Sequence, residues 1–356
     1  MLPKPHKGRG ATLNPPGRFE PAVHEPFDDG WGTIEELALA PAPPTELFPD
    51  QSRRIITTNN SPDIPFDQSI NPYQGCEHGC VYCYARPSHG YLGLSSGLDF
   101  ETRLFVKHDA AELLRAELAR PGYAPKPIAL GANTDPYQPI ERRLQITRRV
   151  LEVLRDARHP VGIVTKSAAV LRDTDLLAPM AALGLARVWL SVTTLDPVLA
   201  RKLEPRAAAP HRRLDAIRGL VAAGIPTGVM VAPIIPALTD HEIERILLAA
   251  AEAGAVGAGY TLVRLPHEVK ELMTGWLEAH YPDRAQHVLS LIRQCRGGRL
   301  NDPRFGSRLH GEGPYARLVA QRFARTCARL GLDKRRMPQR TDLFRRPADG
   351  RQLALL

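Results

Sequence analysis

The stretch IALGANTDPYQPIERRLQITRRVLEVLRDARHPVGIVTK, residues 128–166, sets the pattern on which most of the chain is built. It opens with a short apolar run at 128–132 and closes with a second one, VGIVT, at 161–165. Between these runs, residues 141–157 carry leucine, isoleucine and valine at helical spacing. A strand, a helix and a second strand form a βαβ unit, in which the two strands are parallel.

The same alternation continues toward the C-terminus. Further strands are predicted at 188–192, 229–232 and 258–263. An earlier strand is expected before Cys76, and a helix over 240–253, capped by Thr239 or Asp240. No glycine-rich dinucleotide fingerprint follows any of these strands, so an open nucleotide-binding sheet is disfavoured. The sequence therefore predicts an α/β fold, a partial (βα)6 barrel of the TIM type with parallel strands.

In such barrels the chemistry lies at the C-terminal ends of the strands. The polar or special residues expected there are Asn133, Thr134, Asp135, Lys166, Ser167, Ser191 to Thr194, Pro233 and Arg264. We therefore look for the functional site in this row of residues.

Composition divides the chain into three parts. Residues 1–60 are rich in proline and poor in periodic apolar runs, which predicts an extended N-terminal arm. Residues 61–270 hold the barrel and its cysteine-rich loop. Residues 271–356 are predicted to be helical and basic, with the clearest helix over 314–331, ended by a Gly331 cap.

One uncharged stretch, residues 219–239, is long enough to span a bilayer. It contains three prolines, Pro226, Pro233 and Pro236, and is better interpreted as the end of a helix, a turn and a buried strand. The N-terminus has no apolar core of the kind found in secretory signals. We expect a soluble cytoplasmic protein without membrane partners, in a reducing compartment where grouped thiols indicate metal or redox chemistry.

Charge is unevenly distributed along the 356 residues. The formal net charge is +9, and residues 284–346 hold 16 Lys and Arg against 4 Asp and Glu, a local net charge of +12. The rest of the chain therefore carries −3. This asymmetry favours an anionic partner such as a nucleic acid. Only 8 of the 47 basic residues are lysine, so a general preference for arginine is the alternative explanation.

Three of the five cysteines lie in one short segment, NPYQGCEHGCVYCYARPSHGY, residues 71–91. Cys76, Cys80 and Cys83 have the spacing Cys-x3-Cys-x2-Cys, and thiols this close converge most readily in a loop wrapped around a cofactor. Each iron of a four-iron, four-sulfur cluster needs one external ligand, usually a cysteine thiolate. Three cysteines would therefore leave one iron open.

Other interpretations of the three thiols remain open at this stage. A zinc site would need a fourth ligand, which His78 or His89 would supply. Zinc modules favour two Cys-x2-Cys arms, and only one such arm is present here. Three unbound thiols in an exposed loop would be prone to oxidation. The other two cysteines, Cys295 and Cys327, are expected to be small buried apolar groups.

The Cys-x3-Cys-x2-Cys segment, with Tyr82 just before its last cysteine, resembles the signature of the radical S-adenosylmethionine (SAM) enzymes. The resemblance implies a 4Fe-4S cluster whose open iron is chelated by the amino and carboxylate groups of SAM. It implies that one electron from the cluster cleaves SAM, and that the resulting 5′-deoxyadenosyl radical abstracts hydrogen from the substrate. It also implies a flavodoxin or ferredoxin electron donor, and a contact of Tyr82 with adenine.

Outside the loop, the chain is similar to the spore photoproduct lyase-like group of this family over roughly residues 65–270. The likeness lies in Ala132-Asn133-Thr134-Asp135, Thr165-Lys166, Ser191 and Val231-Ala232-Pro233. It implies that Thr134 and Lys166 meet the SAM carboxylate, and that Ser191 contacts the ribose or the methionyl part. The group returns a hydrogen atom from a cysteine three residues before the aspartate, where this chain has Ala132, so reversal of a thymine dimer by that route is in doubt.

Three functions follow for the whole protein. The first is a radical SAM enzyme that acts on a nucleic-acid lesion or base, with the basic region holding the nucleic acid. The second is the same chemistry directed at a protein or a small metabolite. The third is a non-catalytic, zinc-stabilised nucleic-acid-binding module.

Overall fold

A large, mostly parallel sheet forms the centre of the molecule. The computed structural model describes residues 6–19, 43–333 and 338–348. In the order β10-β9-β8-β7-β6-β3-β2, the strands are Ala258–Leu262, Thr227–Ile234, Ala186–Ser191, Val161–Thr165, Ile128–Leu130, Gln68–Ile70 and Ile56–Thr58. Only β2 runs antiparallel to its neighbour. Six parallel strands, one of them before Cys76, confirm the predicted partial barrel, and β10 and β2 remain as its open edges.

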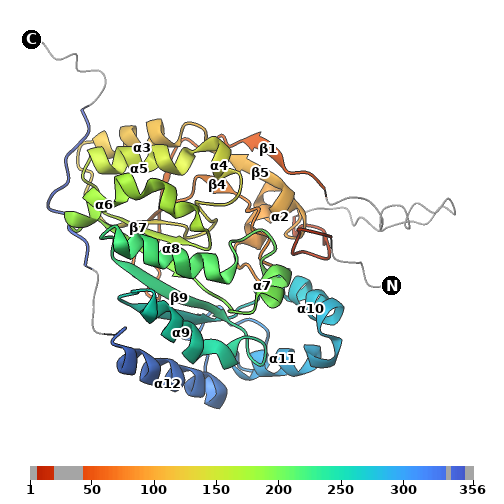
Figure 1. Ribbon diagram of the computed structural model, residues 1–356. Coiled ribbons are helices and arrows are strands. Elements are labelled where there is room, and N and C mark those ends of the chain that lie inside the picture. The colour runs from red at the N-terminus through yellow and green to blue at the C-terminus, as the bar shows by residue number, and fades with distance from the viewer. Residues whose placement is uncertain (1–5, 20–42, 334–337, 349–356) are drawn as a thin grey trace, which may run out of the picture.

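Helices follow the parallel strands and cover the outside of the sheet. Figure 1 shows α3 (Ala110–Ala119), α5 (Ile146–Asp156), α6 (Thr174–Ala182), α8 (Pro210–Ala222) and α9 (Ile243–Glu252) arranged one after another around it. The remaining helical segments are η1 (Arg86–Leu92), α2 (Asp99–Thr102), α4 (Glu141–Leu144), η2 (Ala168–Asp173), α7 (Pro197–Leu203), η3 (Asp240–Glu242), α10 (Val269–His280), α11 (Pro282–Gln294) and α12 (Gly313–Leu330).

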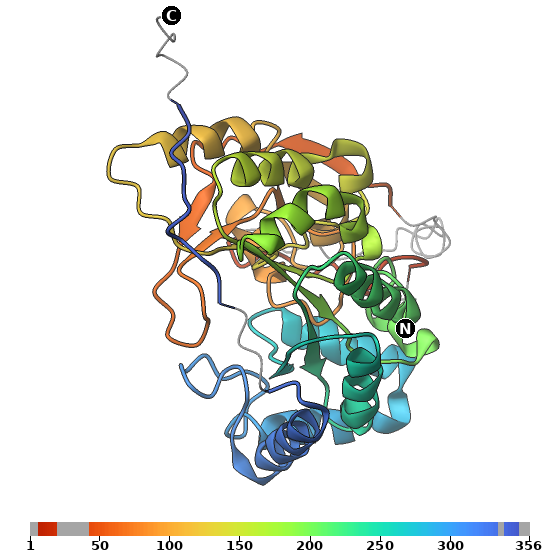
Figure 2. The ribbon, with the colours of Figure 1, turned by 60° about the vertical axis from the view of Figure 1, so that its left-hand side comes forward.

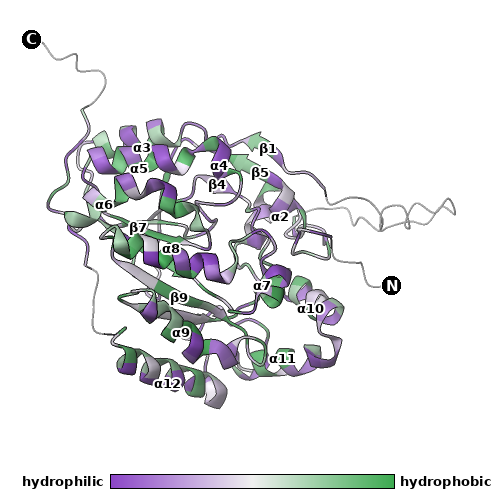
Figure 3. Ribbon diagram, in the orientation of Figure 1, coloured by the Kyte–Doolittle hydropathy of each residue, from purple (hydrophilic) through white to green (hydrophobic). Residues whose placement is uncertain are grey.

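The outer helices are amphipathic, and their apolar faces build the main core. Figure 3 shows hydrophobic and hydrophilic segments alternating along these helices. Val150 and Leu154 of α5 are fully buried in one cluster with Ile163 of β7 and Leu220 of α8. Burying each such side chain stabilises the fold by about 1.5–3 kcal/mol. The spacing of apolar residues along the sequence thus predicts the correct faces.

Two predicted helix details are wrong. The helix predicted over 141–157 is broken at Gln145, where φ is +51°, into α4 and α5. The side chain of Glu141 accepts hydrogen bonds at 3.1 Å from the amides of Ile146 and Thr147, so it caps α5 from inside the expected helix. Neither predicted cap of the helix over 240–253 is observed. The Thr239 hydroxyl accepts the Ile235 amide at 2.9 Å, Asp240 accepts the Tyr315 hydroxyl at 2.7 Å, and α9 begins at Ile243 without a side-chain cap.

A second, small sheet lies beside the barrel. It has the order β1-β5-β4, with bounds Glu46–Pro49, Arg103–Val106 and Tyr73–Gln74. Strands β1 and β2 both come from the last part of the predicted N-terminal arm. Residues 1–5 and 20–42 of that arm lie outside the described residues.

The open side of the barrel is bridged by side chains and backbone. The Leu262 amide, at the end of β10, donates to the Leu309 carbonyl at 2.8 Å. Arg308 forms an ion pair of 2.6 Å with Asp63, which follows β2, and the Gly306 amide donates to the same carboxylate at 2.8 Å. The two edge strands are thereby connected without pairing directly.

The C-terminal segment 338–348 runs back across the barrel, as Figure 2 shows. Gln339 donates to the carbonyls of Val161 and Leu185, at the start of β7 and just before β8. Helix α12 ends at Gly331 in the left-handed conformation, as predicted. The uncharged stretch 219–239 consists of the end of α8, a turn and β9, also as predicted. Every helix in the described part of the chain is too short or too polar to cross a bilayer.

Candidate functional site

The cysteine loop follows β4 and lies at the C-terminal ends of the barrel strands. The Cys76 amide donates to the Phe100 carbonyl at 2.9 Å, and the Val81 amide donates to the Leu203 carbonyl at 3.1 Å. Gly75 and Gly79 have φ of +83° and +68°, which only glycine adopts without strain. These contacts fix the loop from two sides, α2 and α7.

The N-terminal segment covers the outer side of this loop. Gly10 approaches the Gly79 carbonyl so closely that a Cβ atom on it would lie 1.7 Å from that oxygen. The Gly10 and Ala11 amides donate to the buried Glu101 carboxylate at 3.0 and 2.8 Å. Arg86 forms a fully buried ion pair with the same Glu101 at 2.5 Å and donates to the Cys80 carbonyl at 2.8 Å. Sequence patterns did not predict that the N-terminal segment covers the loop, because its hydrogen-bond partner Glu101 lies about 90 residues further along the chain.

The three thiols are close enough to influence one another. Burial raises the pKa of Cys76 well above its usual range, and the charges of Asp135 and Cys80 raise it further. Burial likewise raises the pKa of Cys80, assisted by Glu204, while Lys166 opposes the shift. Cys83 is half-buried and contributes to both shifts. Such thiols become thiolates readily only when a metal centre replaces the lost solvation.

The geometry does not fit a single zinc ion. Among the described residues, no three His, Cys, Asp or Glu side chains converge so as to hold one metal ion. A four-iron cluster has a different requirement, since each cysteine binds a separate iron. His78 faces Asp135, with 3.3 Å between Nδ1 and the carboxylate, and His89 Nε2 lies 2.9 Å from the Arg103 carbonyl. Neither histidine therefore completes a zinc site with the thiols.

Lys166, directly after β7, lies beside the cysteine loop. Its ammonium nitrogen is 5.9 Å from the centre of the Tyr82 ring, and its charge acts on Cys80 and Glu204. In the described part of the chain the ammonium has no ion pair or hydrogen bond. A half-buried cation without an ion pair, at the mouth of a barrel, is suited to bind a carboxylate.

Beneath the loop lies a buried network that sequence analysis missed. The Tyr82 hydroxyl donates to the Glu204 carboxylate, which also accepts Thr193 Oγ1 at 2.6 Å and pairs with Arg213. Burial alone would raise the pKa of Glu204, but the charges of Arg213 and Lys166 outweigh it and lower that pKa to about 2. The network holds the Tyr82 ring in one place.

Thr134 and Asp135 connect the loop to β6 and β7. Thr134 is buried and its hydroxyl donates to the Tyr73 carbonyl at 2.8 Å, so only its acceptor capacity is free. Asp135 accepts Thr165 Oγ1 and the Lys166 amide, both at 2.7 Å. Burial would raise the pKa of Asp135, but His78 and these hydrogen bonds lower it to about 2.

Ser191 ends β8 and is buried. Its carbonyl accepts Arg213 Nη1 at 3.0 Å, which links it to the Tyr82–Glu204 network. Its hydroxyl makes no hydrogen bond with a described residue. The four predicted SAM contacts, Tyr82, Thr134, Lys166 and Ser191, thus all lie at the C-terminal ends of the strands or on the cysteine loop. Cys295 and Cys327 are buried elsewhere, as expected.

An arginine and a tyrosine lie at the same mouth. Tyr84 is 44% exposed, its hydroxyl donates to the Ala132 carbonyl, and Arg264 lies over its ring at 4.5 Å. Arg308 lies 4.7 Å over the ring of Phe305, which is 60% exposed, and its charge reaches Tyr84 and Arg264. Only Arg264 had been singled out from the sequence, by its position after a strand.

Comparisons with known proteins match this arrangement. The family model described as "Radical SAM superfamily" matches residues 70–250. The protein Rv2578c of Mycobacterium tuberculosis is 36% identical over 237 residues, which cover 66% of this chain and 70% of that protein. The radical SAM Nalpha-GlyT isomerase of Pseudomonas phage M6 is 26% identical over 203 residues, 56% of this chain and 40% of that protein.

Among solved structures, spore photoproduct lyase complexed with dinucleoside spore photoproduct has a TM-score of 0.56 to this chain. It is 17% identical and the match covers 80% of this chain and 78% of that one, so the two share a fold. The radical SAM domain and the isomerase relative support an enzyme and speak against the non-catalytic zinc module. Since the family model spans half of the sequence, including the loop and the strand ends described above, this enzyme belongs to the radical SAM superfamily.

Proposed function

We propose that this protein binds a 4Fe-4S cluster through Cys76, Cys80 and Cys83, binds SAM beside it, and uses reductive cleavage of SAM to abstract hydrogen from a substrate. The observation that carries the proposal is the position of Lys166. Its unpaired ammonium lies over Tyr82 and acts on Cys80, so one cation faces the place where three thiols gather. When bound, the cluster supplies the electron that cleaves SAM.

The residues of this chain have distinct tasks in that scheme. Lys166 neutralises the SAM carboxylate through a charge-assisted hydrogen bond. Thr134 accepts a hydrogen bond from the SAM amino group and not, as the resemblance implies, one with the SAM carboxylate, because its own proton is already donated to the Tyr73 carbonyl and an ionised carboxylate has no proton to donate. Ser191 offers its free hydroxyl to the ribose or the methionyl part. Tyr82 presents its ring to adenine, held by Glu204 through its hydroxyl.

The surroundings favour a dry site. Arg86, Glu101 and the N-terminal cover surround the loop with buried, fully paired groups. Excluding water strengthens the electrostatic contacts to SAM and protects a reactive intermediate from side reactions. The cluster potential required is low, so a flavodoxin or ferredoxin is the proposed electron donor, in the cytoplasm.

For the substrate, we favour a nucleic-acid lesion or base. The Arg264–Tyr84 pair lies at the mouth, and an arginine over a partly exposed tyrosine ring suits phosphates and bases. The fold neighbour named above was solved with a dinucleoside lesion. Since position 132 is alanine, hydrogen return by a thiol at that position is not part of the proposal. A protein or small-metabolite substrate is the alternative.

The test compares cysteine variants of the full chain after anaerobic reconstitution with iron and sulfide. Cys76→Ala, Cys80→Ala and Cys83→Ala should each lose bound iron and abolish 5′-deoxyadenosine formation from SAM under dithionite. Cys327→Ala is the matched control, a buried thiol outside the loop, and should retain both. Undiminished 5′-deoxyadenosine formation in all three loop variants would overturn the proposal.

A further inference from the structure

A cavity of roughly 460 Å³ lies next to the cysteine loop, which contributes His78 to its lining. Its walls come from the segments after β6, β7 and β8 and from the loop itself. The lining residues are His78, Tyr137, Pro139, Arg142, Ser167, Ala168, Ala169, Arg172, Arg206, Ala207, Ala208 and Arg212. None of the proposed SAM contacts is among them, although Ser167 directly follows Lys166 and His78 belongs to the cysteine loop.

Four of these lining residues are arginines, and no carboxylate lines the cavity. Small side chains, four of them alanines, form much of the remaining lining. Guanidinium groups bind carboxylates and phosphates through paired hydrogen bonds of fixed geometry. A concave site with this lining is therefore suited to an anion.

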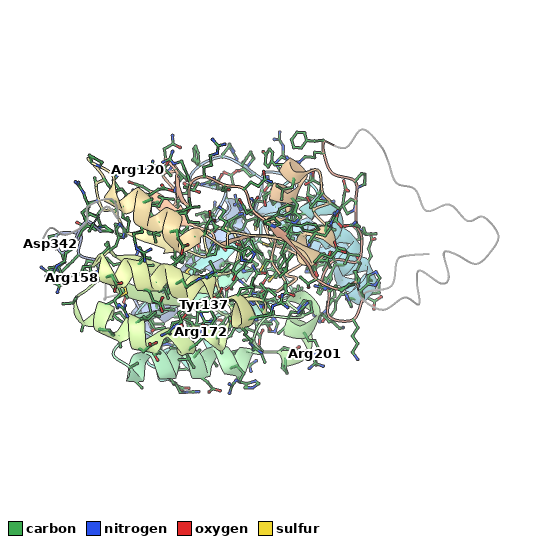
Figure 4. All side chains as sticks on the ribbon, turned by 90° about the horizontal axis from the view of Figure 1, so that it is seen from above. Arg120, Tyr137, Arg158, Arg172, Arg201 and Asp342 are labelled. Carbon is green, nitrogen blue, oxygen red and sulfur yellow. The ribbon has the colours of Figure 1, made fainter. Side chains whose placement is uncertain are left out.

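Two of the four arginines form ion pairs with carboxylates that do not themselves line the cavity. Arg172 pairs with Glu141 at 2.9 Å and Asp173 at 2.7 Å, and it lies 5.7 Å over the ring of Tyr137. Figure 4 shows Tyr137 and Arg172 next to each other, from neighbouring segments. Arg206 pairs with Glu77 at 3.0 Å. Fixed side chains lose little conformational entropy when a ligand arrives.

The other two arginines are uncompensated. Arg142 and Arg212 are exposed, and neither side chain has an ion pair or hydrogen bond with any residue in 6–19, 43–333 or 338–348. With Arg172 and Arg206 already neutralised by buried carboxylates, the cavity presents about two positive charges without partners. A terminal phosphate carries about −1.5 to −2 charges at neutral pH, which matches this number.

We propose that this cavity binds a phosphate-bearing ligand, with a terminal phosphate held by Arg142 and Arg212 against the fixed guanidinium groups of Arg172 and Arg206. The inference goes beyond the proposed radical chemistry and does not depend on it. A carboxylate carries one charge and would leave the cavity half-neutralised, so phosphate is favoured over the acidic side chains of a protein. The phosphate belongs either to a free nucleotide or to the end of a nucleic acid.

The experiment measures binding to the full chain at fixed low salt, with and without reconstitution. The probes are inorganic pyrophosphate, a 5′-mononucleotide, and a short single-stranded oligonucleotide with and without a 5′-phosphate. The variant is Arg142→Ala with Arg212→Ala, both exposed, and its thermal unfolding midpoint without ligand should equal that of the wild type. The control is Arg120→Ala with Arg201→Ala, two exposed arginines that Figure 4 shows on opposite sides of Tyr137 and Arg172.

We expect pyrophosphate to bind the wild type and the control equally, and the cavity variant about tenfold or more weakly. Tighter binding of the 5′-phosphorylated oligonucleotide than of its 5′-hydroxyl form identifies a nucleic-acid end, and binding of pyrophosphate and mononucleotide alone identifies a free nucleotide. The proposal fails if no phosphate probe binds the wild type, or if the cavity variant equals the control. It also fails if a glutamate-rich peptide binds the cavity and the phosphate probes do not.

Discussion

The basic C-terminal region and the arginine cavity use the same side chain in different ways. Residues 284–346 carry a net charge of +12, yet several of their arginines are committed to partners within the fold. Those arginines are Arg296, Arg304, Arg308, Arg322 and Arg340. The cavity lies in the part of the chain with a net charge of −3, and its four arginines converge on one volume.

The difference shows that a charge count along a sequence does not locate an anion site. What matters is whether each guanidinium group already has a partner, and whether several face the same space. Some of these carboxylates are close in sequence, as Asp302 is to Arg304, whereas Glu141 lies 31 residues before Arg172, so only the fold shows which guanidinium groups have partners. The following experiments test this distinction between committed and uncommitted cations, from the largest expected effect to the smallest.

The sharpest comparison involves two adjacent residues, Arg212 and Arg213. Arg213 is buried, pairs with Glu204, and donates to the Ser191 and Ala208 carbonyls, whereas Arg212 is exposed and lines the cavity. Arg213→Ala should lower the free energy of unfolding by about 3–5 kcal/mol, because it leaves a buried charge unpaired. Arg212→Ala should change it by less than about 0.5 kcal/mol. Urea unfolding of the apoprotein measures both, and equal effects would contradict the distinction.

Acid should weaken the same committed pair. The pKa of Glu204 is about 2 in the folded protein, below its unfolded value of 4.5, so its stabilisation is present above pH 4.5 and is lost as the pH falls toward 2. The size of this contribution is about 3 kcal/mol. The gap in unfolding free energy between the wild type and Glu204→Gln should therefore narrow by that amount between pH 5 and pH 2.

Arg142→Ala serves as the control for the acid experiment. Arg142 has no carboxylate partner among the described residues. The unfolding free energy of Arg142→Ala should therefore change with pH in parallel with that of the wild type over the same pH range. A gap for Glu204→Gln that is independent of pH would show that this carboxylate is not held ionised by Arg213 in the folded state.

A third comparison uses two lysines that both lie over tyrosine rings. Lys166 is 5.9 Å from the centre of the Tyr82 ring, and Lys202, on α7, is 4.6 Å from that of Tyr281, which follows α10. Lys166→Ala should weaken SAM binding by about 1.5–3 kcal/mol, tenfold or more, with the iron content unchanged. Lys202→Ala should leave SAM affinity unchanged. Equilibrium binding to the reconstituted protein measures both, and equal affinities would remove Lys166 from the SAM site.

Much of the fold follows from local patterns in the sequence. The strands predicted at 128–132, 161–165 and 188–192 agree with β6, β7 and β8 within a few residues. This agreement is possible because the spacing and the number of apolar residues are properties of a short stretch of sequence. The break at Gln145 was not predictable from the same patterns. It depends on the Glu141 side chain turning back to cap α5, while Arg172 from the next unit neutralises that carboxylate.

The candidate site likewise contains residues that the sequence predicts and residues that it does not. Cys76, Cys80 and Cys83 are recognisable because their spacing is short, and Lys166 because it directly follows an apolar run. Glu204 carries no such signal, since it contacts Tyr82 across 122 residues of sequence, and Arg213 joins the network by pairing with Glu204. The arginine cavity was missed for the same reason: its lining comes from four separate segments, and only their folding shows which guanidinium groups lack a partner.

The smallest expected effect concerns the outer face of α12. Arg317 and Arg325 are exposed there, lie in the most basic part of the sequence, and have no side-chain partner within the described ranges. Arg317→Ala with Arg325→Ala should change the free energy of unfolding by less than about 0.5 kcal/mol per site. It should leave pyrophosphate binding unchanged, because two guanidinium groups in open solvent do not enclose an anion. If this variant instead lost pyrophosphate binding as strongly as the cavity variant, the local net charge would have been the better guide, and convergence of side chains would not decide where an anion binds.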